Sequence, residues 1–439
     1  MKVVAGGTVS RLLRGVEIPK MFCARQAFPA EHIAPEDIPA AVRAQLSLRQ
    51  FDEKIKPGME IAITAGSRGV RNVDIITKSI VDYVKDKDAT PFIVPAMGSH
   101  GGATAIGQAE MLASFGITSK AMGCEIRSSM EVVELGYSPK RHKRVVMDRN
   151  AYGADGIIVS CRLKPHNAFR GTHESGPCKM MTVGLGKQVG ASVVHSDGMG
   201  EIGLNIPDMA SVVIDKAPIL FAIPCIENAY DETYKIEAIQ PEDILEREHE
   251  LLQVAFANMP RLIVGEADVL VVDEIGKNYS GTGVDPNITG TFSTEFAHGG
   301  LKVQRTAFLN LSEVSHGNAL GVGLASVITR KIFDEMDPEK MYPNCLTSTV
   351  LKSACIPCVV SSDKEAVQLC IKTLNGLDGR SPRVVRIPNS LHVGTIMLSE
   401  AYYTDVVAGK YKGLEATGGP EPLSFDERGE LAPMRLGEA

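Results

Sequence analysis

One stretch of the chain brings together side chains that are capable of chemistry. His166 follows a proline, Lys179 comes thirteen positions later, and His195 follows Lys179 by sixteen positions. The residues between them are rich in glycine and carry few charges. An ordinary apolar core excludes a base, an amine and a metal ligand unless each has a partner. We therefore interpret this stretch as a cofactor site.

Lys179 and His195 are the two residues of this stretch best suited to hold a cofactor. Glycine, proline, methionine and valine surround Lys179, and a lysine in apolar surroundings loses charge and gains nucleophilicity. Lys179 is therefore a candidate covalent anchor, with a lysine that extends to solvent as the ordinary alternative. His195 follows two valines and is a candidate metal ligand, with Asp197 as its hydrogen-bond partner. A hydrogen-bonded core histidine is the alternative.

A second histidine motif, Gly98-Ser99-His100-Gly101-Gly102, provides a candidate acid or base. The flanking glycines Gly98, Gly101 and Gly102 leave the imidazole uncrowded and let a ligand approach the backbone, so we interpret them as cofactor-binding. Together His100 and His166 supply two bases, which is what inversion of one carbon centre requires, because protons are handled on both faces of the substrate. A histidine that bonds to its own turn is the alternative at either position.

Other polar residues are candidates for supporting roles. Arg68 and Arg71 follow an early apolar run and are suited to gripping a carboxylate, unless they form surface ion pairs. Lys277 is a candidate substrate-binding residue. Lys277 and the loop that contains His316 lie at element junctions in the second half of the chain and would face the crevice from the other domain, although ordinary helix caps look similar. His173 competes with His166 for the role of base, although a solvated loop residue is the commoner explanation.

The cysteines are the remaining reactive side chains. The nine cysteines are scattered through the chain, which is typical of reduced thiols rather than a disulfide framework. Cys355 and Cys358 form the one close pair; we expect two buried structural thiols there, with redox function as the minor alternative. Cys178, beside Lys179, is either reactive or a small packing residue.

The elements that position these residues follow an alternating pattern. Apolar runs at residues 61–64, 92–96 and 156–160 each end in a polar, glycine-containing loop, and helical periodicity follows the first two. This alternation predicts an α/β fold with mainly parallel sheets. Ligands bind such sheets at the carboxyl ends of the strands, so we expect the loops with Arg68, His100 and His166 to share one crevice.

A domain boundary is predicted near residue 260. A charged helical segment, 241–258, ends just before Met259-Pro260. Beyond it we expect a second α/β unit, with strands at 267–273, 358–361 and 384–387 and helices at 319–336 and 364–374. The predicted organisation is a domain of residues 1–260 with the cofactor and catalytic residues, a domain of 261–412 that closes an active-site cleft, and a peripheral tail of 413–439.

Composition narrows the class of partner. The 439 residues carry a formal net charge of −7, which argues against nucleic acid or an anionic membrane as the main partner. The chain start lacks a secretory signal pattern, and no uncharged run approaches the ~20 residues that span a bilayer. We therefore expect a cytoplasmic protein that acts on a small molecule.

The order of these motifs resembles the nickel-pincer lactate racemase family of hydroxy-acid racemases and epimerases. That family has an arginine loop, a Gly-x-His loop, a Pro-His loop, a cofactor-anchoring lysine and, sixteen positions later, a nickel-ligating histidine. Here the corresponding residues are Arg68, His100, His166, Lys179 and His195. The resemblance covers most of the first 260 residues or so and is vaguer beyond them.

The resemblance implies a cofactor and a reaction. The cofactor would be a nickel-pincer nucleotide, a pyridinium-3,5-bisthiocarboxylic acid mononucleotide with nickel, tethered to Lys179 and ligated through the metal by His195. His100 and His166 would be the catalytic bases and Arg68 would bind the substrate carboxylate. The reaction would invert the hydroxyl-bearing carbon next to a carboxylate, by reversible hydride transfer to the cofactor. Enzymes that build the cofactor would be necessary partners.

This chain also departs from the family pattern. Ala65 stands where the family commonly has an acidic residue, and the loop from His166 to Lys179 looks longer than usual. Both changes favour a hydroxy acid larger than lactate, such as a sugar acid. A nicotinamide-dependent hydroxy-acid oxidoreductase is the alternative enzyme, although the dinucleotide glycine fingerprint is missing. A non-catalytic nucleotide or metal carrier is the third interpretation.

Overall fold

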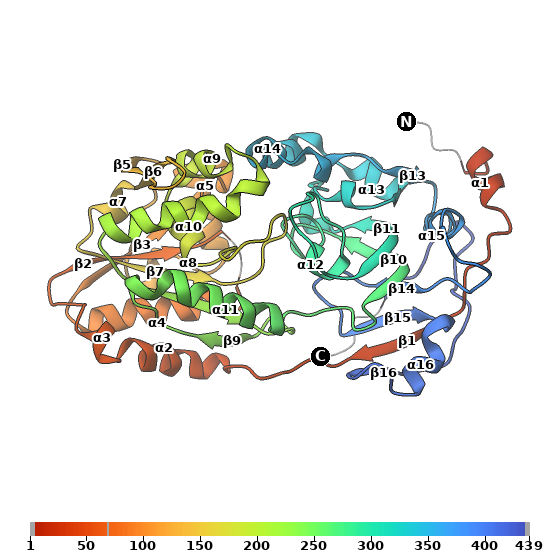
Figure 1. The fold of residues 1–439 in the computed structure, drawn as a ribbon, viewed down its shortest axis with the longest axis horizontal. Coiled ribbons are helices and arrows are strands. Elements are labelled where there is room, and N and C mark those ends of the chain that lie inside the picture. The colour runs from red at the N-terminus through yellow and green to blue at the C-terminus, as the bar shows by residue number, and fades with distance from the viewer. Residues whose placement is uncertain (1–4, 68–69, 435–439) are drawn as a thin grey trace. The chain divides into compact units, whose positions relative to one another are not determined.

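The computed structural model describes residues 5–67 and 70–434 and divides into two compact units (Figure 1). The middle unit is Pro29–Met259, and the terminal unit combines Met1–Phe28 with Pro260–Ala439. Arg68, the predicted carboxylate-binding residue, lies outside the described residues. The chain passes from the middle unit to the terminal unit between residues 259 and 260, and its first 28 residues group with its last 180. The predicted division into domains of 1–260 and 261–412 with a tail of 413–439 stays a prediction.

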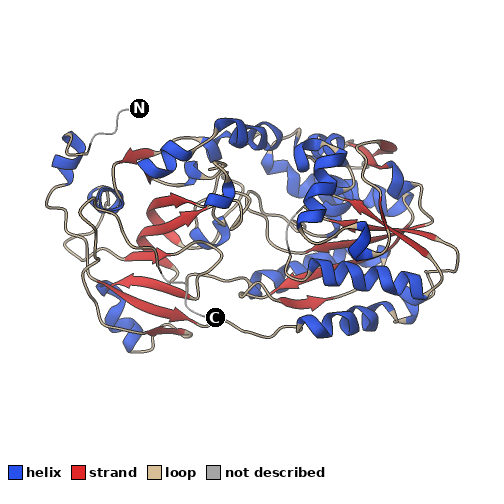
Figure 2. Ribbon diagram, turned by 180° about the vertical axis from the view of Figure 1, so that it is seen from behind, coloured by secondary structure: helices blue, strands red, loops and turns tan. Residues whose placement is uncertain are grey.

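The middle unit is built on a mainly parallel sheet of order β4-β3-β2-β7-β8-β9, in which β9 alone is antiparallel among the described strands. The strands are β2 (Glu60–Ala65), β3 (Thr90–Pro95), β4 (Glu125–Ile126), β7 (Gly156–Arg162), β8 (Ile219–Glu227) and β9 (Thr233–Ile236). A separate hairpin pairs β5 (Val132–Tyr137) with β6 (Arg144–Asp148). Figure 2 shows helices on both sides of this sheet.

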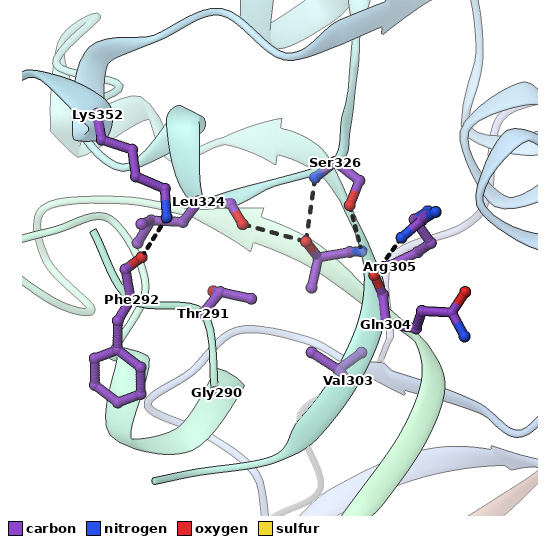
Figure 3. A pocket seen from close by; sticks show the side chains of 10 residues that line it. Gly290, Thr291, Phe292, Val303, Gln304, Arg305, Leu324, Ser326 and Lys352 are labelled. Atoms are coloured by element: carbon purple, nitrogen blue, oxygen red, sulfur yellow. Dashed lines mark hydrogen bonds between the residues drawn. The ribbon is translucent and has the colours of Figure 1, made fainter. Parts of the chain in front are cut away.

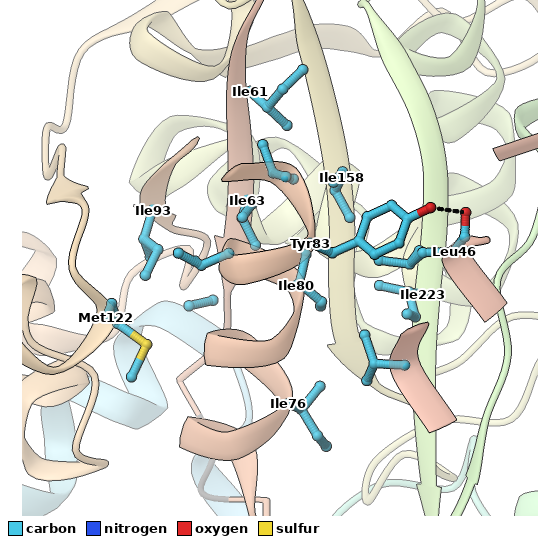
Figure 4. Packing of buried hydrophobic residues seen from close by; sticks show 14 of the residues in the cluster. Leu46, Ile61, Ile63, Ile76, Ile80, Tyr83, Ile93, Met122, Ile158 and Ile223 are labelled. Atoms are coloured by element: carbon cyan, nitrogen blue, oxygen red, sulfur yellow. Dashed lines mark hydrogen bonds between the residues drawn. The ribbon is translucent and has the colours of Figure 1, made fainter. Parts of the chain in front are cut away.

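Helices cover the middle unit's sheet because each buries one apolar face. The helices are α2 (Ile38–Leu46), α3 (Arg49–Asp52), α4 (Val73–Asp86), α5 (Ala105–Ser114), α6 (Ser119–Met122), α7 (Arg149–Tyr152), α8 (Pro177–Lys179), α9 (Lys187–His195), α10 (Met199–Lys216) and α11 (Ile244–Asn258). In α4, Ile76, Ile80 and Val84 recur at helical spacing and are buried against β2 and β3. Tyr83 of α4 donates a hydrogen bond of 2.9 Å to the Leu46 carbonyl, which joins α4 to α2 (Figure 4).

The terminal unit has an eight-stranded mixed sheet of order β13-β12-β11-β10-β14-β15-β1-β16. The strands are β1 (Met21–Gln26), β10 (Glu266–Ile275), β11 (Lys302–Leu311), β12 (Val327–Thr329), β13 (Cys358–Val360), β14 (Val384–Ile387), β15 (Thr395–Ser399) and β16 (Leu414–Ala416). The helices are α1 (Thr8–Leu13), α12 (Pro286–Thr289), α13 (Arg330–Glu335), α14 (Pro338–Ser348), α15 (Asp363–Lys372) and α16 (Tyr403–Val407). Pairing is parallel from β13 to β14 and antiparallel from β14 to β16.

The predicted α/β class with mainly parallel sheets is confirmed, and the strands predicted from apolar runs are present. The helix predicted at 319–336 is wrong, because this stretch contains the buried strand β12 and only the short helix α13. Gly321 and Gly323 lie so close to neighbouring carbonyls that no side chain fits at either position, which marks an irregular turn. A short buried strand and a helical segment look alike as an apolar run.

The predicted peripheral tail is part of the terminal unit's packing as far as residue 434. Its strand β16 pairs with β1, and Arg386 donates a hydrogen bond of 2.7 Å to the Ala432 carbonyl. Among the described residues, no helix is long and apolar enough to cross a membrane.

Candidate functional site

Two strand-end loops of the middle unit contact one helical turn, and a third leads into it along the chain. The strands β3, β2 and β7 are neighbours in the sheet, and the turn η3 (Met180–Gly184) is π-helical, a form often found at functional sites. From the loop after β3, the Gly98 amide donates to the Gly184 carbonyl at 3.1 Å. From the loop after β2, a side chain added at Gly66 would lie 3.1 Å from the Met180 methyl group. Lys179 immediately precedes this turn.

His100, in the loop after β3, is held in one tautomer by its own loop. Its Nδ1 lies 2.9 Å from the Met97 carbonyl oxygen. Because a carbonyl only accepts, Nδ1 carries the proton and the ring's lone pair is on Nε2. The Gln108 amide supports the loop, since it donates to the carbonyls of Gly98 at 2.9 Å and His100 at 3.3 Å. His100 is therefore prepared to accept a proton at Nε2.

His166, in the loop after β7, is held in the opposite tautomer. Its Nδ1 accepts a hydrogen bond of 3.1 Å from the Ala168 amide, so the neutral ring carries its proton on Nε2. The His166 amide donates to Glu174 at 2.6 Å, and its ring lies against Phe169 with centroids 4.3 Å apart. Neutral His166 thus presents an N–H hydrogen-bond donor at Nε2, where neutral His100 presents a lone pair.

Lys179 is half-buried and lies among groups that respond to its charge. Glu174 is almost fully buried, and burial raises its pKa, while hydrogen bonds and the charges of Arg170 and Lys179 oppose the rise. Burial also lowers the pKa of His195, and the Lys179 charge lowers it further. Lys179 therefore lies within electrostatic reach of both the Pro-His loop and the helix that ends at His195.

His195, the last residue of α9, has the geometry of a metal ligand. Its Nδ1 lies 2.6 Å from the Ala191 carbonyl, so Nδ1 carries the proton and Nε2 carries the lone pair. Within residues 5–67 and 70–434, Nε2 has no hydrogen-bond partner. The expectation that Asp197 orients His195 is wrong, because Asp197 pairs with Lys143 at 2.6 Å and the backbone takes its place.

The glycines predicted to bind cofactor have other structural reasons to be glycine. Gly98, at φ +57°, packs against Val183 of η3 and Ala191 of α9. Gly101, at φ +64°, lies against the backbone of Gly107 and Gln108, so a side chain there would clash. Gly102 also has positive φ, but no atom lies within 4 Å of the position of an added Cβ. Their predicted role in binding remains a prediction.

His173 does not behave as predicted. It is buried rather than solvated, and both ring nitrogens are held, Nδ1 by the Thr172 hydroxyl at 2.9 Å and Nε2 by the Leu245 carbonyl at 2.7 Å. Burial lowers its pKa. Leu245 belongs to α11, so the helix that buries this loop histidine lies about seventy positions further along the chain.

A charged cluster that no sequence motif indicated lies at the same edge of the sheet. Arg162, at the end of β7, pairs with Glu227 at the end of β8, and the Glu227 carboxylate also accepts from the Arg71 amide at 2.8 Å. Burial, and next the Glu227 charge, raise the pKa of Asp231 to about 6, while Arg162 and Lys164 oppose the rise. The available sequence signal was that Arg162 and Lys164 directly follow a buried apolar strand.

Lys277 and His316 belong to the terminal unit. The Lys277 ammonium donates to the Gly281 carbonyl at 2.7 Å and to the Asn344 side chain at 3.0 Å. His316 is exposed, with φ +47°, and its carbonyl accepts from Lys340. The predicted role of Lys277 in substrate binding, and the predicted cleft between domains, stay predictions.

A cavity of about 250 Å³ lies in the terminal unit (Figure 3). It is lined by Arg305, Lys352 and polar groups near the start of β11, and the Lys352 ammonium donates to the Phe292 carbonyl at 2.8 Å. The amino-terminal half of β11 is the wrong end of the strand for a ligand site in a parallel α/β sheet. None of the predicted site residues lines this cavity.

The cysteines are free thiols, as expected, but only five of the nine are buried. Cys355 and Cys358 are exposed, which makes the expectation of buried structural thiols wrong there. Cys178 is buried, and burial raises its pKa well above the ordinary value, so it is a packing residue rather than a reactive thiol.

Within the described part of the chain, no three His, Cys, Asp or Glu side chains gather in a way that would hold a metal ion by themselves. A metal in the middle unit would need donors beyond His195. A nickel-pincer nucleotide would bring its own sulfur and carbon donors and would need one imidazole from the protein. The Nε2 lone pair of His195 could be that donor, and Lys179 could be the covalent anchor.

Comparison with known proteins gives only distant likenesses, to solved structures. No protein-family model and no curated protein matches the chain. Among solved structures, it is similar to the lactate racemase apoprotein from Thermoanaerobacterium thermosaccharolyticum, with a TM-score of 0.42 and 14% identity over 83% of this chain and 84% of that chain. At this level the likeness identifies neither residue roles nor a substrate.

Proposed function

We propose that this chain is an isomerase that inverts the hydroxyl-bearing carbon next to a carboxylate in a 2-hydroxy acid. The observation that carries the proposal is the pair of opposite tautomers, His100 with its lone pair on Nε2 and His166 with its proton on Nε2. Both histidines lie in loops at the carboxyl ends of strands that flank β2. An inversion needs one group that takes the hydroxyl proton and another that returns it.

In the proposed reaction His100 Nε2 removes the proton from the substrate hydroxyl and becomes an imidazolium. His166, which must itself be an imidazolium for this step, returns its Nε2 proton to the oxygen after the carbon has become planar and becomes neutral. One ring is neutral and the other protonated at each end of a turnover, so reversal exchanges the two roles. A nickel-pincer nucleotide, when bound, supplies the acceptor for the hydrogen on carbon. Lys179 would hold this group covalently, and His195 Nε2 would complete the nickel coordination.

The substrate is proposed as a hydroxy acid larger than lactate, for instance a sugar acid. What supports a larger substrate is Ala65 in place of an acidic side chain and the long loop between His166 and Lys179. Arg68 is the proposed partner of the substrate carboxylate. The charged cluster of Arg162, Lys164 and Asp231 lies at the same sheet edge and offers polar contacts for additional hydroxyl groups.

The covalent anchor is tested by intact-protein mass spectrometry after co-expression with cofactor-building enzymes. We expect a mass increase that matches the nucleotide in the wild type and in Lys54→Ala, and its loss in Lys179→Ala. Lys54 is the matched control, because it is also half-buried in the middle unit and its ammonium donates to the Leu220 carbonyl at 3.0 Å. An unmodified wild-type protein that still racemises hydroxy acids would overturn the assignment of Lys179.

A further inference from the structure

Lys187 is a fully buried lysine with an uncommon backbone conformation. It is 0% exposed, and its φ is +55°, in the left-handed region that disfavours side chains with a Cβ. Lysine is almost never fully buried unless it is paired, and the residue before it is already glycine. The lysine at this strained position therefore requires an explanation in what its ammonium contacts.

The ammonium joins three parts of the middle unit. It donates to the Pro95 carbonyl at the end of β3 at 2.5 Å and to the Gln108 side-chain oxygen on α5 at 3.3 Å. It also pairs with the buried Asp148 carboxylate at the end of β6 at 3.1 Å. Burial lowers the pKa of Lys187, and the charge of Asp148 opposes that change.

The contact with Gln108 controls the loop that carries His100. A lysine ammonium only donates, so the oxygen of the Gln108 amide must face it, and the amide nitrogen then faces the loop. That nitrogen donates to the carbonyls of Gly98 and His100. Lys187 thereby fixes the orientation of an amide that holds the loop at two points.

The same lysine begins the helix that ends at His195. Lys187 is the first residue of α9 and His195 the last. Asp148 ties this start to the residue that follows the turn η3, because the Asp148 amide donates to the Leu185 carbonyl at 2.7 Å. The Lys187 ammonium thus connects the loop that carries His100, the segment after Lys179 and the helix α9 that ends at His195.

We propose that Lys187 is a positioning residue that sets the His100 loop against the helix carrying His195, acting through Gln108. The inference rests on the proposed function for the catalytic meaning of His100 and His195. The mechanical link itself does not depend on any reaction, so it is measurable in the protein without substrate.

The test is the tautomer of His100, observed by NMR of histidine-labelled protein, with His100→Asn to assign the signal. In the wild type we expect the Nδ1-protonated form alone. Lys187→Met should convert it into a mixture of tautomers, and should reduce kcat by ~10- to 100-fold with little change in KM, because misplacement affects the reacting geometry. Gln108→Met, which retains the Lys187 and Asp148 pair, should give the same spectral change.

The double variant Lys187→Met, Asp148→Leu distinguishes a positioning role of Lys187 from a purely stabilising ion pair with Asp148. Removal of both charges should restore thermal stability without restoring the single His100 tautomer. Arg386→Met is the control, because it breaks another buried pair, with Asp273 at 2.7 Å in the terminal unit, and should leave the His100 signal unchanged. An unchanged His100 signal in Lys187→Met or Gln108→Met, or its full recovery in the double variant, overturns the proposal. A wild type with the expected signal but no racemase activity would instead refute the proposed function alone.

Discussion

His100 and His166 differ in which ring nitrogen the backbone holds. Met97 offers a carbonyl to His100, whereas Ala168 offers an amide to His166. The two neutral imidazoles therefore present a lone pair and a proton, respectively, at the Nε2 position. Proton transfer additionally requires that one ring be neutral and the other protonated, and histidine supplies both forms near neutral pH.

Asparagine at either position tests this arrangement without loss of the backbone contact. The Asn side chain can donate to Met97 or accept from Ala168, as Nδ1 does, but it has no group at the Nε2 position. We expect His100→Asn and His166→Asn each to lower the rate of interconversion by ~10²- to 10⁴-fold in both directions. The measurement is racemisation of single-enantiomer hydroxy acids by protein loaded with cofactor.

His249→Asn is the matched control for these variants. Its Nδ1 also bonds to a backbone carbonyl, that of Thr172 at 3.1 Å, but the side chain is exposed on α11. This variant should keep the wild-type rate. A His100→Asn or His166→Asn protein with more than a tenth of wild-type activity would exclude the two-base mechanism.

The candidate site residues that the sequence indicates are those set by local structure. His100 and His166 are candidates because each follows a buried apolar strand, and strand ends are where ligands bind. His173, Lys187 and Glu248 could not be interpreted in this way. Each is explained by a contact with a segment more than thirty residues away, such as Leu245 for His173 or Asp148 for Lys187.

At the scale of elements, helix α11 supports the short helix α8 that ends at Lys179. Glu248 of α11 is 1% exposed and accepts a hydrogen bond of 2.7 Å from the Cys178 amide at the start of α8. A Cβ added at Gly176 would lie 2.6 Å from a Glu248 carboxylate oxygen, so a larger residue there would displace that carboxylate. The carboxylate thus satisfies a helix amide that has no partner within α8.

Glu248 should make stability depend on pH. Burial raises its pKa from 4.5 to about 7, and the Cys178 groups only partly oppose this. The folded protein therefore holds a proton that the unfolded chain releases, so this stabilisation is complete below pH 4.5 and is lost as pH rises through about 7. Between these two pKa values, each pH unit of increase lowers the free energy of unfolding by about 1.4 kcal/mol.

Glu248→Gln mimics the protonated side chain at every pH. We expect it to melt close to the wild type at pH 4.5 and higher by on the order of 5 °C at pH 8, as measured by calorimetry. Glu246→Gln, on the exposed side of α11, should change neither value. If the difference in melting temperature between Glu248→Gln and the wild type instead widened toward low pH, Glu248 would be ionised in the folded protein throughout.

At the scale of the whole molecule, the middle unit is an insertion into the terminal unit. The chain forms β1, leaves to build residues 29–259, and returns at Pro260. Strand β1 lies between β15 and β16, and its partners Ile396 and Leu414 are more than 370 positions away from it. A run of six residues carries no signal of such distant pairing, which is why the sequence predicted an undivided domain of residues 1–260.

Deletion of residues 1–28 distinguishes these two organisations. We expect the deletion to remove hydrogen-exchange protection from β15 and β16, because both lose an antiparallel neighbour, while β2, β3 and β7 keep theirs. Deletion of residues 1–14 is the control, since it removes α1 but leaves β1, and should preserve protection in both sheets. Mass spectrometry of exchanged peptides measures each strand separately. Protection lost in the middle unit but kept in β15 would mean that residues 1–28 stabilise the domain predicted from sequence, and that the two units are not built as the strand order indicates.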